Sequence, residues 1–123
     1  MERGDVTNVP TTEIGTILTD VVHWPQVLVV SIKRFSYAMG GLRKLTQHVQ
    51  FNERWEVQPG IGYQLAGVIQ HQGKAGLLGH YVAYVRAADG MWYLCNDTRA
   101  PCVVPVAHVL RQEAYMLMYT RQP

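Results

Sequence analysis

The stretch Leu78-Gly79-His80-Tyr81-Val82-Ala83-Tyr84-Val85, followed after an Asp89-Gly90 turn by Trp92-Tyr93-Leu94-Cys95-Asn96-Asp97, decides the fold of this chain. Two apolar runs separated by a short turn predict a β-hairpin. With a loop of two to four residues, antiparallel register places His80 opposite a position between Asp97 and Arg99. The hairpin is therefore expected to bring a histidine close to the amide of Asn96 and the carboxylate of Asp97.

This pairing has a chemical meaning. An imidazole that acts as a general base presents one ring nitrogen to the reacting group while an amide or carboxylate oxygen holds the other. Either Asn96 or Asp97 is suited to fix the tautomer of His80. Gly79 has no side chain, which leaves room for an extended substrate backbone beside the histidine. The same residues also fit a histidine at a strand edge with a polar turn, so the hairpin alone indicates a candidate site and no reaction.

The composition indicates one compact globular domain, with 123 residues, 48% of them hydrophobic, 16% charged, and a formal net charge of +2. Lys and Arg are scattered, which argues against nucleic acid as a partner, and no apolar run is long enough to span a membrane. Cys95 and Cys102 lack CxxC spacing and no secretory signal precedes them. The expected location is therefore intracellular, in the cytoplasm, the nucleus or both.

The remaining segments predict an α+β fold, a mostly antiparallel β-sheet with one short helix. The unbroken apolar run after Pro25 favours a central strand covered on both faces, with Lys33 and Arg34 emerging at the surface. The other expected elements are a hairpin at 35–51, a strand at 62–71, a flexible loop at 72–76, a helix at 106–112 and a last strand at 113–119. Residues 1–20 show no clear period and are expected to form a lead-in segment made mainly of loop.

Five segments, in this order, resemble the signature of the ubiquitin-specific protease family. They are Pro25–Phe35, Tyr63–Val68, Gly79–Val85, Trp92–Asp97 and Glu113–Tyr119. The resemblance covers residues 21–121 and corresponds to the C-terminal, histidine-bearing half of that family's catalytic domain. It implies the palm-like half of a papain-like cysteine peptidase fold.

The resemblance also implies a reaction, cleavage of the bond after the C-terminal glycine of ubiquitin or of a ubiquitin-like modifier. By position, His80 is the general base, Asn96 orients it, and Asp97 is a neighbouring acidic residue able to assist. Gly79 and Tyr81 would line the narrow channel that admits two glycines. No cofactor and no metal are implied, and His71, His80, Cys95, Cys102 and His108 show no ligand spacing.

One feature of the family is missing from these residues, the box of Gly, Asn and Thr that precedes its nucleophilic cysteine. Cys95 and Cys102 both follow His80, and neither opens a helix where the dipole would favour a thiolate. We therefore expect this chain alone to be inactive. Three interpretations remain open. The nucleophile lies in a longer protein or on a second polypeptide; the chain is a non-catalytic ubiquitin-binding module; or it is a structural fragment.

Overall fold

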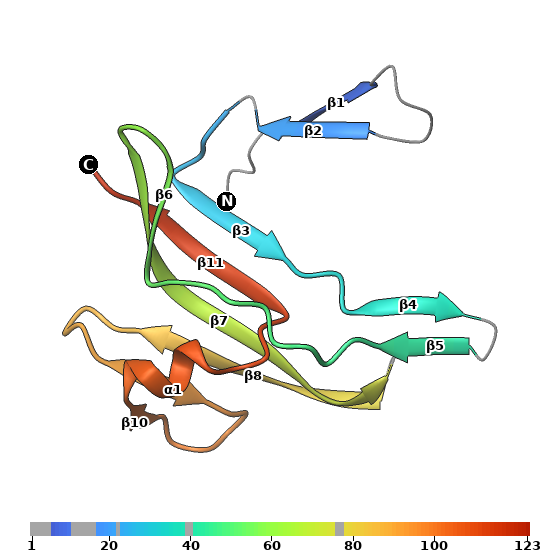
Figure 1. The fold of residues 1–123 in the computed structure, drawn as a ribbon. Helices are drawn as coiled ribbons and strands as arrows, with labels where there is room; N and C mark the ends of the chain where they lie inside the picture. The colour runs from blue at the N-terminus through green and yellow to red at the C-terminus, as the bar shows by residue number, and fades with distance from the viewer. Residues whose placement is uncertain (1–5, 11–16, 22, 39–40, 76–77) are drawn as a thin grey trace.

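The computed structural model describes residues 6–10, 17–21, 23–38, 41–75 and 78–123 (Figure 1). Its sheet is organised around β7 (Ile61–Ala75), a strand of 15 residues. Strand β11 (Met116–Arg121) pairs with one edge of β7. Strands β6 (Arg54–Gln58) and β8 (Leu78–Arg86) pair with the other edge, β6 near the start of β7 and β8 near its end. All three neighbours are antiparallel to β7.

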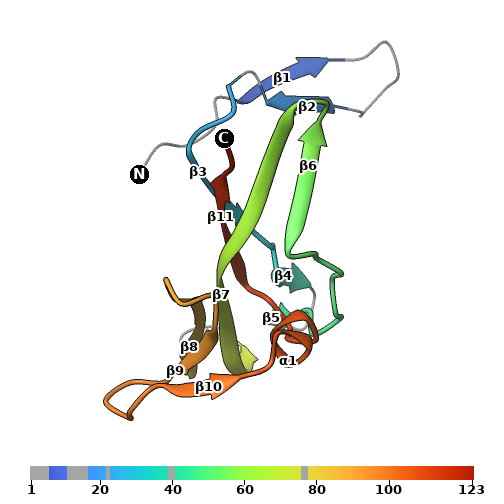
Figure 2. The same ribbon diagram turned by 90° about the vertical axis from the view of Figure 1, so that its left-hand side faces the viewer.

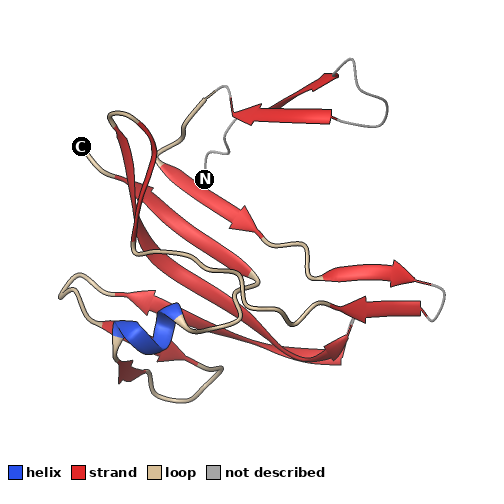
Figure 3. Cartoon of the chain, in the orientation of Figure 1, coloured by secondary structure: helices blue, strands red, loops and turns tan. Residues whose placement is uncertain are grey.

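Three more strands complete a seven-stranded antiparallel sheet in the order β10-β9-β8-β7-β11-β3, with β6 beside β7. They are β3 (Val27–Ser31), β9 (Trp92–Cys95) and β10 (Cys102–Val104). In the part of the chain that the structure describes, the only helix is α1 (Val106–Leu110), which Figure 3 shows beside β8 and β10. None of the described residues forms a helix long and apolar enough to cross a membrane.

The core lies on one face of this sheet, as the alternation of its strands requires. Along β8 the alternate residues Val82 and Tyr84 are buried, and in register with them β7 contributes the fully buried Val68. Helix α1 and the segment after it cover this face with Val109 and Ala114, both 0% exposed. Val109 is the buried residue of the helix, and Val106 and Leu110 pack partly buried against the same core, so burial and not helix length holds the helix in place.

Two hairpins lie outside the main sheet. The first pairs β1 (Val6–Pro10) with β2 (Ile17–Val21) beyond the N-terminal end of β3 (Figure 1). The segment expected to be mainly loop thus contains a strand pair, while the domain division at residue 20 stays a prediction. The second hairpin pairs β4 (Phe35–Ala38) with β5 (Gly41–Lys44) and extends to one side of the sheet in Figure 1, whereas Figure 2 looks along it. A hairpin was predicted here.

The predicted fold class is confirmed, a mostly antiparallel sheet with one short helix. The helix starts at the predicted Val106 and ends two residues early at Leu110. Residues 87–91 connect β8 to β9, and the tip of this turn has the expected length of two to four residues. Ala87 N–H donates to the carbonyl of Met91 at 2.9 Å, and Gly90 with φ 84° then closes a tight three-residue tip.

The last strand, predicted at 113–119, is β11 at Met116–Arg121, and the hairpin predicted over 35–51 ends at Lys44. Three further sequence predictions were wrong in detail. Strand β3 stands at the end of the sheet with half-buried side chains, because an apolar run does not distinguish an edge from a centre. Arg34 is 2% exposed instead of lying at the surface. Its guanidinium donates to the carbonyls of Ala114 at 2.7 Å, Leu45 at 3.1 Å and Gln47. Residues 72–75, expected as loop, continue β7 through a bulge at its end.

Candidate active site

His80 belongs to β8 and Asn96 directly follows β9, so the two residues meet at one end of the same strand pair. The register ends by pairing Ala83 with Cys95. Continued by three residues it would bring His80 level with Thr98, within the range expected from the sequence, although the chain turns after Asn96. The Nε2 atom of His80 lies 2.6 Å from Oδ1 of Asn96, a hydrogen-bond distance. The two residues are therefore in contact, while their catalytic roles stay predictions.

Asp97 lies farther from the ring, with its Oδ2 atom 3.6 Å from His80 Nε2. Its φ of 51° falls in the left-handed region, which Asp tolerates because its short side chain forms local hydrogen bonds. The N–H of Arg99 donates to the carbonyl of Asn96 at 3.1 Å and closes a turn around Asp97. The Asp97 side chain is 69% exposed, so solvent weakens its interaction with the ring. Asn96 is the principal partner of His80.

The hydrogen bond to Asn96 selects one tautomer of the His80 ring. An amide oxygen can only accept, so Nε2 carries the proton and donates it. In the neutral ring, the lone pair is then on Nδ1, the nitrogen left to take a proton from a nucleophile. The side chain of His80 is 40% exposed and therefore accessible to a reacting group. The arrangement has the form of a general base with its orienting amide.

Gly79 and Tyr81 flank His80, and both lie next to a second histidine, His71. A Cβ atom at Gly79 would be 2.0 Å from Nε2 of His71, so only glycine fits here. Tyr81 is half exposed, and its ring centroid lies 5.0 Å from that of His71. Because side chains alternate along a strand, Gly79 and Tyr81 face away from the side of β8 that carries His80. Their place in a substrate channel stays a prediction, and the structure adds a packing reason for Gly79.

The two cysteines are free and are located on opposite faces of the sheet. Cys102 pairs with Leu94 and shares its face, whereas Cys95 is the next residue along β9 and points to the other face. This geometry does not allow a disulfide between them without movement of the backbone. A Cys102 thiolate would be close enough to Tyr84 to contribute, after burial, to the raised pKa of that phenol. Both cysteines lie in strands, and neither opens α1, the helix of the described residues.

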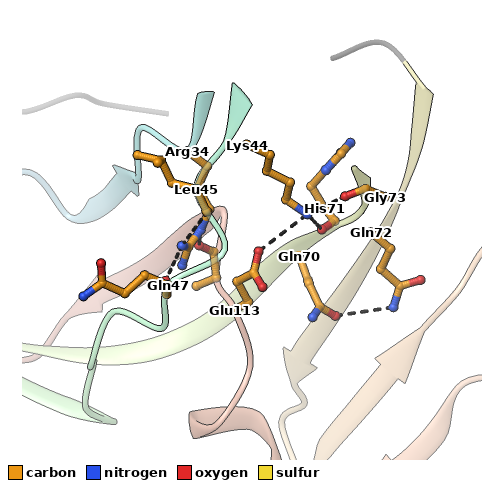
Figure 4. A network of polar contacts seen from close by, with 10 residues as sticks. Arg34, Lys44, Leu45, Gln47, Gln70, His71, Gln72, Gly73 and Glu113 are labelled. Atoms are coloured by element: carbon orange, nitrogen blue, oxygen red, sulfur yellow. Dashed lines mark hydrogen bonds and ion pairs between the residues drawn. The ribbon is translucent and has the colours of Figure 1, made fainter. Parts of the chain in front are cut away.

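Sequence reasoning missed a buried polar cluster behind this site, formed by Arg34, Lys44, His71 and Glu113 (Figure 4). Lys44 Nζ donates to the backbone carbonyls of His71 at 2.8 Å and Gly73 at 2.9 Å, and it pairs with Glu113 Oε1 at 3.5 Å. The cluster joins segments far apart in the chain, so no local pattern announces it. The one available signal was a histidine inside an apolar, alternating strand.

His71 is 3% exposed, and neither of its ring nitrogens has a hydrogen-bond partner among the described residues. Burial lowers the pKa of His71, because it penalises the charged form. The positive charge of Lys44 lowers it further, against a smaller opposing effect from Glu113. The ring is therefore neutral near pH 7. Among the described residues there is no group of three or more His, Cys, Asp or Glu side chains arranged to hold a metal ion.

Comparison with known proteins assigns this chain to a family. The family model described as ubiquitin carboxyl-terminal hydrolase matches residues 8–119. Ubiquitin carboxyl-terminal hydrolase 17-like protein D of Mus musculus is 36% identical over 106 residues, which cover 80% of this chain and 19% of that protein. The chain thus spans about a fifth of the length of this relative.

Solved structures agree. The Ubp8-Sgf11-Sgf73-Sus1 SAGA DUB module contains a chain that is 28% identical, with a TM-score of 0.82 over 95% of this chain and 29% of the other. A SAGA DUB module bound to monoubiquitin contains a chain 25% identical, with a TM-score of 0.78 over 98% of this chain and 31% of the other. The family match covers most of the sequence. The chain belongs to the ubiquitin carboxyl-terminal hydrolase family and is part of a ubiquitin-specific protease domain.

Proposed function

We propose that this chain supplies the general base of a thiol-dependent deubiquitinase, with His80 as the base and Asn96 as the residue that orients it. The observation that carries the proposal is the 2.6 Å contact between His80 Nε2 and Asn96 Oδ1 in a chain of this family. The nucleophilic cysteine is supplied by a segment outside these 123 residues, in the same protein or on a second polypeptide. The substrate is ubiquitin or a ubiquitin-like modifier, and the compartment is the cytoplasm, the nucleus or both.

In the completed site, His80 Nδ1 takes the proton of the cysteine thiol, and the thiolate attacks the carbonyl carbon of the terminal glycine. His80 then gives that proton to the leaving amine as the C–N bond breaks, which leaves a thioester. Water attacks the thioester with His80 again as base, so that the carboxylate is released and the thiol is restored. Through both steps Asn96 accepts from Nε2–H and holds the ring in one orientation. Asp97, 3.6 Å from the same nitrogen, stabilises the imidazolium.

Gly79 and Tyr81 are proposed to border the channel for the two C-terminal glycines of the modifier. The half-exposed ring of Tyr81 supports this position, because its surface is open to solvent one residue after His80, on the opposite face of β8. A channel bordered by a glycine backbone and an aromatic ring admits residues without side chains and excludes bulkier ones.

A second candidate function is a non-catalytic ubiquitin-binding module that keeps the sheet. The arrangement of the two cysteines favours it, because Cys95 and Cys102 lie in strands on opposite faces, where neither thiol has a helix dipole to stabilise a thiolate. In this case the chain binds ubiquitin without chemistry.

A ubiquitin probe with a cysteine-reactive C-terminal warhead distinguishes the two functions. We expect no labelling of the chain alone, and labelling of a cysteine-bearing half of a family catalytic domain only when the chain is added. The chain with His80→Ala is the matched control and should not support labelling. Ubiquitin binding without any labelling would favour the second function. Labelling of Cys95 or Cys102 in the chain alone, lost in the corresponding Cys→Ser variant, would contradict the first.

A further inference from the structure

We propose that His71 is a positioning residue for His80, acting through its contact with Gly79, an inference that rests on the proposed role of His80 as the base. The neutral His71 ring fills the space beside Gly79 and thereby fixes the backbone at the start of β8. His80 follows Gly79 directly, so the position of this backbone decides where the His80 ring meets Asn96.

The contact between His71 and Gly79 is close. An added Cβ at residue 79 would lie 2.0 Å from Nε2 and 2.6 Å from Cε1 of His71, and 2.9 Å from the carbonyl oxygen of Gln72. The register at this point pairs His71 with Tyr81 and Gln72 with His80. Any displacement of the His71 ring therefore acts on the two strand positions that hold His80.

Aromatic rings surround His71 and keep it in one place. The ring centroids of Tyr81, Phe35 and Tyr115 lie 5.0, 5.4 and 6.4 Å from the His71 centroid. Among the described residues, the charged groups that act on it are Lys44 from β5 and Glu113 from the segment before β11. Because the ring nitrogens have no polar partner among the described residues, the neutral ring packs here as an apolar body.

Lys44 holds the backbone of β7 at and after His71. Its ammonium group, on a side chain that is 5% exposed, binds the carbonyls of His71 and Gly73 and pairs with Glu113. Gly73 has a φ of 125°, so the ammonium group holds the backbone where β7 departs from regular strand geometry. The end of β7 is thus tied to β5 and to Glu113, and its His71 ring is pressed against Gly79.

The test uses the full chain and needs no ubiquitin. The readouts are the His80 imidazole Nε2–H signal, which reports the bond to Asn96, and the amide exchange of His80 and Tyr81. Gly79→Ala should weaken or abolish the Nε2–H signal, because the new methyl group collides with the His71 ring. His71→Ala should broaden the signal, because β8 loses its support. The double variant should recover part of the signal, since the methyl group then points into the vacated space.

Gly67→Ala is the matched control in β7, because a Cβ there would meet its nearest atoms at 3.6 and 3.7 Å, which are ordinary contacts. It should leave both readouts unchanged. An unchanged His80 signal in His71→Ala, or a double variant as impaired as Gly79→Ala, would overturn the inference. If His71→Ala does not fold, His71→Phe is measured instead. We expect its apolar ring to retain the His80 signal, and loss of that signal would contradict the inference. The His80 signal and the amide exchange do not depend on ubiquitin labelling. A failure of the proposed function can therefore be distinguished from a failure of the proposed role of His71.

Discussion

Two histidines at the same end of the β7–β8 pair show how one ladder supports two different environments. His80 is 40% exposed at its side chain and has an amide and a carboxylate near one ring nitrogen. His71 is 3% exposed, has aromatic neighbours, and has no polar partner for its ring among the described residues. They occupy adjacent register pairs, so their side chains point to opposite faces. The exposed His80, with polar partners, is suited to exchange a proton, whereas the buried His71, with aromatic neighbours, is suited to support the backbone.

The largest effect is expected from removing the exposed histidine. His80→Ala in the completed catalytic domain should reduce acylation by about 10²–10⁴-fold, the usual contribution of a positioned base. Ubiquitin affinity and the unfolding midpoint of the chain should change little, because the ring is partly exposed and packs in no core. Single-turnover labelling, ubiquitin titration and urea unfolding measure the three quantities. Unchanged turnover would show that His80 is not the base.

A smaller loss is expected from Asn96→Ala, below about 10²-fold in acylation, since the base remains and only its orientation is freed. Asp97, 3.6 Å from the same ring nitrogen, partly replaces the lost partner. The double variant Asn96→Ala/Asp97→Ala should therefore lose more than the product of the two single losses. A double-variant loss equal to the product of the two single losses would contradict the idea that Asn96 and Asp97 act on the same ring nitrogen.

On the buried side, Lys44→Met should lower the free energy of unfolding by about 1–3 kcal/mol, because it leaves two carbonyls without their donor and Glu113 without its ion-pair partner. Urea unfolding of the chain measures this. Lys33→Met is the matched control, since Lys33 is exposed and should cost little. Equal effects of the two substitutions would mean that the buried ammonium group contributes nothing special to stability.

The smallest expected effect is a pH dependence. The pKa of His71 is lower in the fold than its ordinary value of 6.5, so the unfolded chain binds more protons in the range between the two values. Stability from this group is complete above about pH 6.5 and falls as the pH drops toward the lowered pKa. His71→Phe should flatten this part of the urea-unfolding profile. A slope unchanged in His71→Phe would assign it to other groups.

The features predicted from the sequence are those that local pattern decides. Alternating and unbroken apolar runs indicated most strands of the sheet, and the segment from Val106 indicated the helix. The contact of His80 with Asn96 was predictable because a short turn fixes the register of a hairpin. The register of a strand pair also decides which face of the sheet each side chain occupies. Counting residues from the turn was therefore enough to predict that His80 and Asn96 lie close together.

The features that escaped prediction depend on distant segments. Arg34 looked like a polar strand end, but carbonyls at residues 45, 47 and 114 surround its guanidinium. His71 looked like an ordinary strand residue until Lys44 and Gly79 were placed against it. Gly79 itself was interpreted as leaving room for substrate. Only the pairing of β7 with β8 shows that a Cβ atom at residue 79 would lie 2.0 Å from Nε2 of His71. Such contacts follow from the fold and not from a window of sequence.

The measurement that tests the central claim most directly is the tautomer of His80, read from long-range ¹H–¹⁵N correlations of the imidazole in the intact chain. Our account predicts that the neutral ring carries its proton on Nε2, hydrogen-bonded to Asn96, with Nδ1 unprotonated, and that Asn96→Ala produces a mixture of tautomers. A proton on Nδ1 in the unmodified chain, or a spectrum that Asn96→Ala does not change, would contradict His80 as the oriented base of this domain.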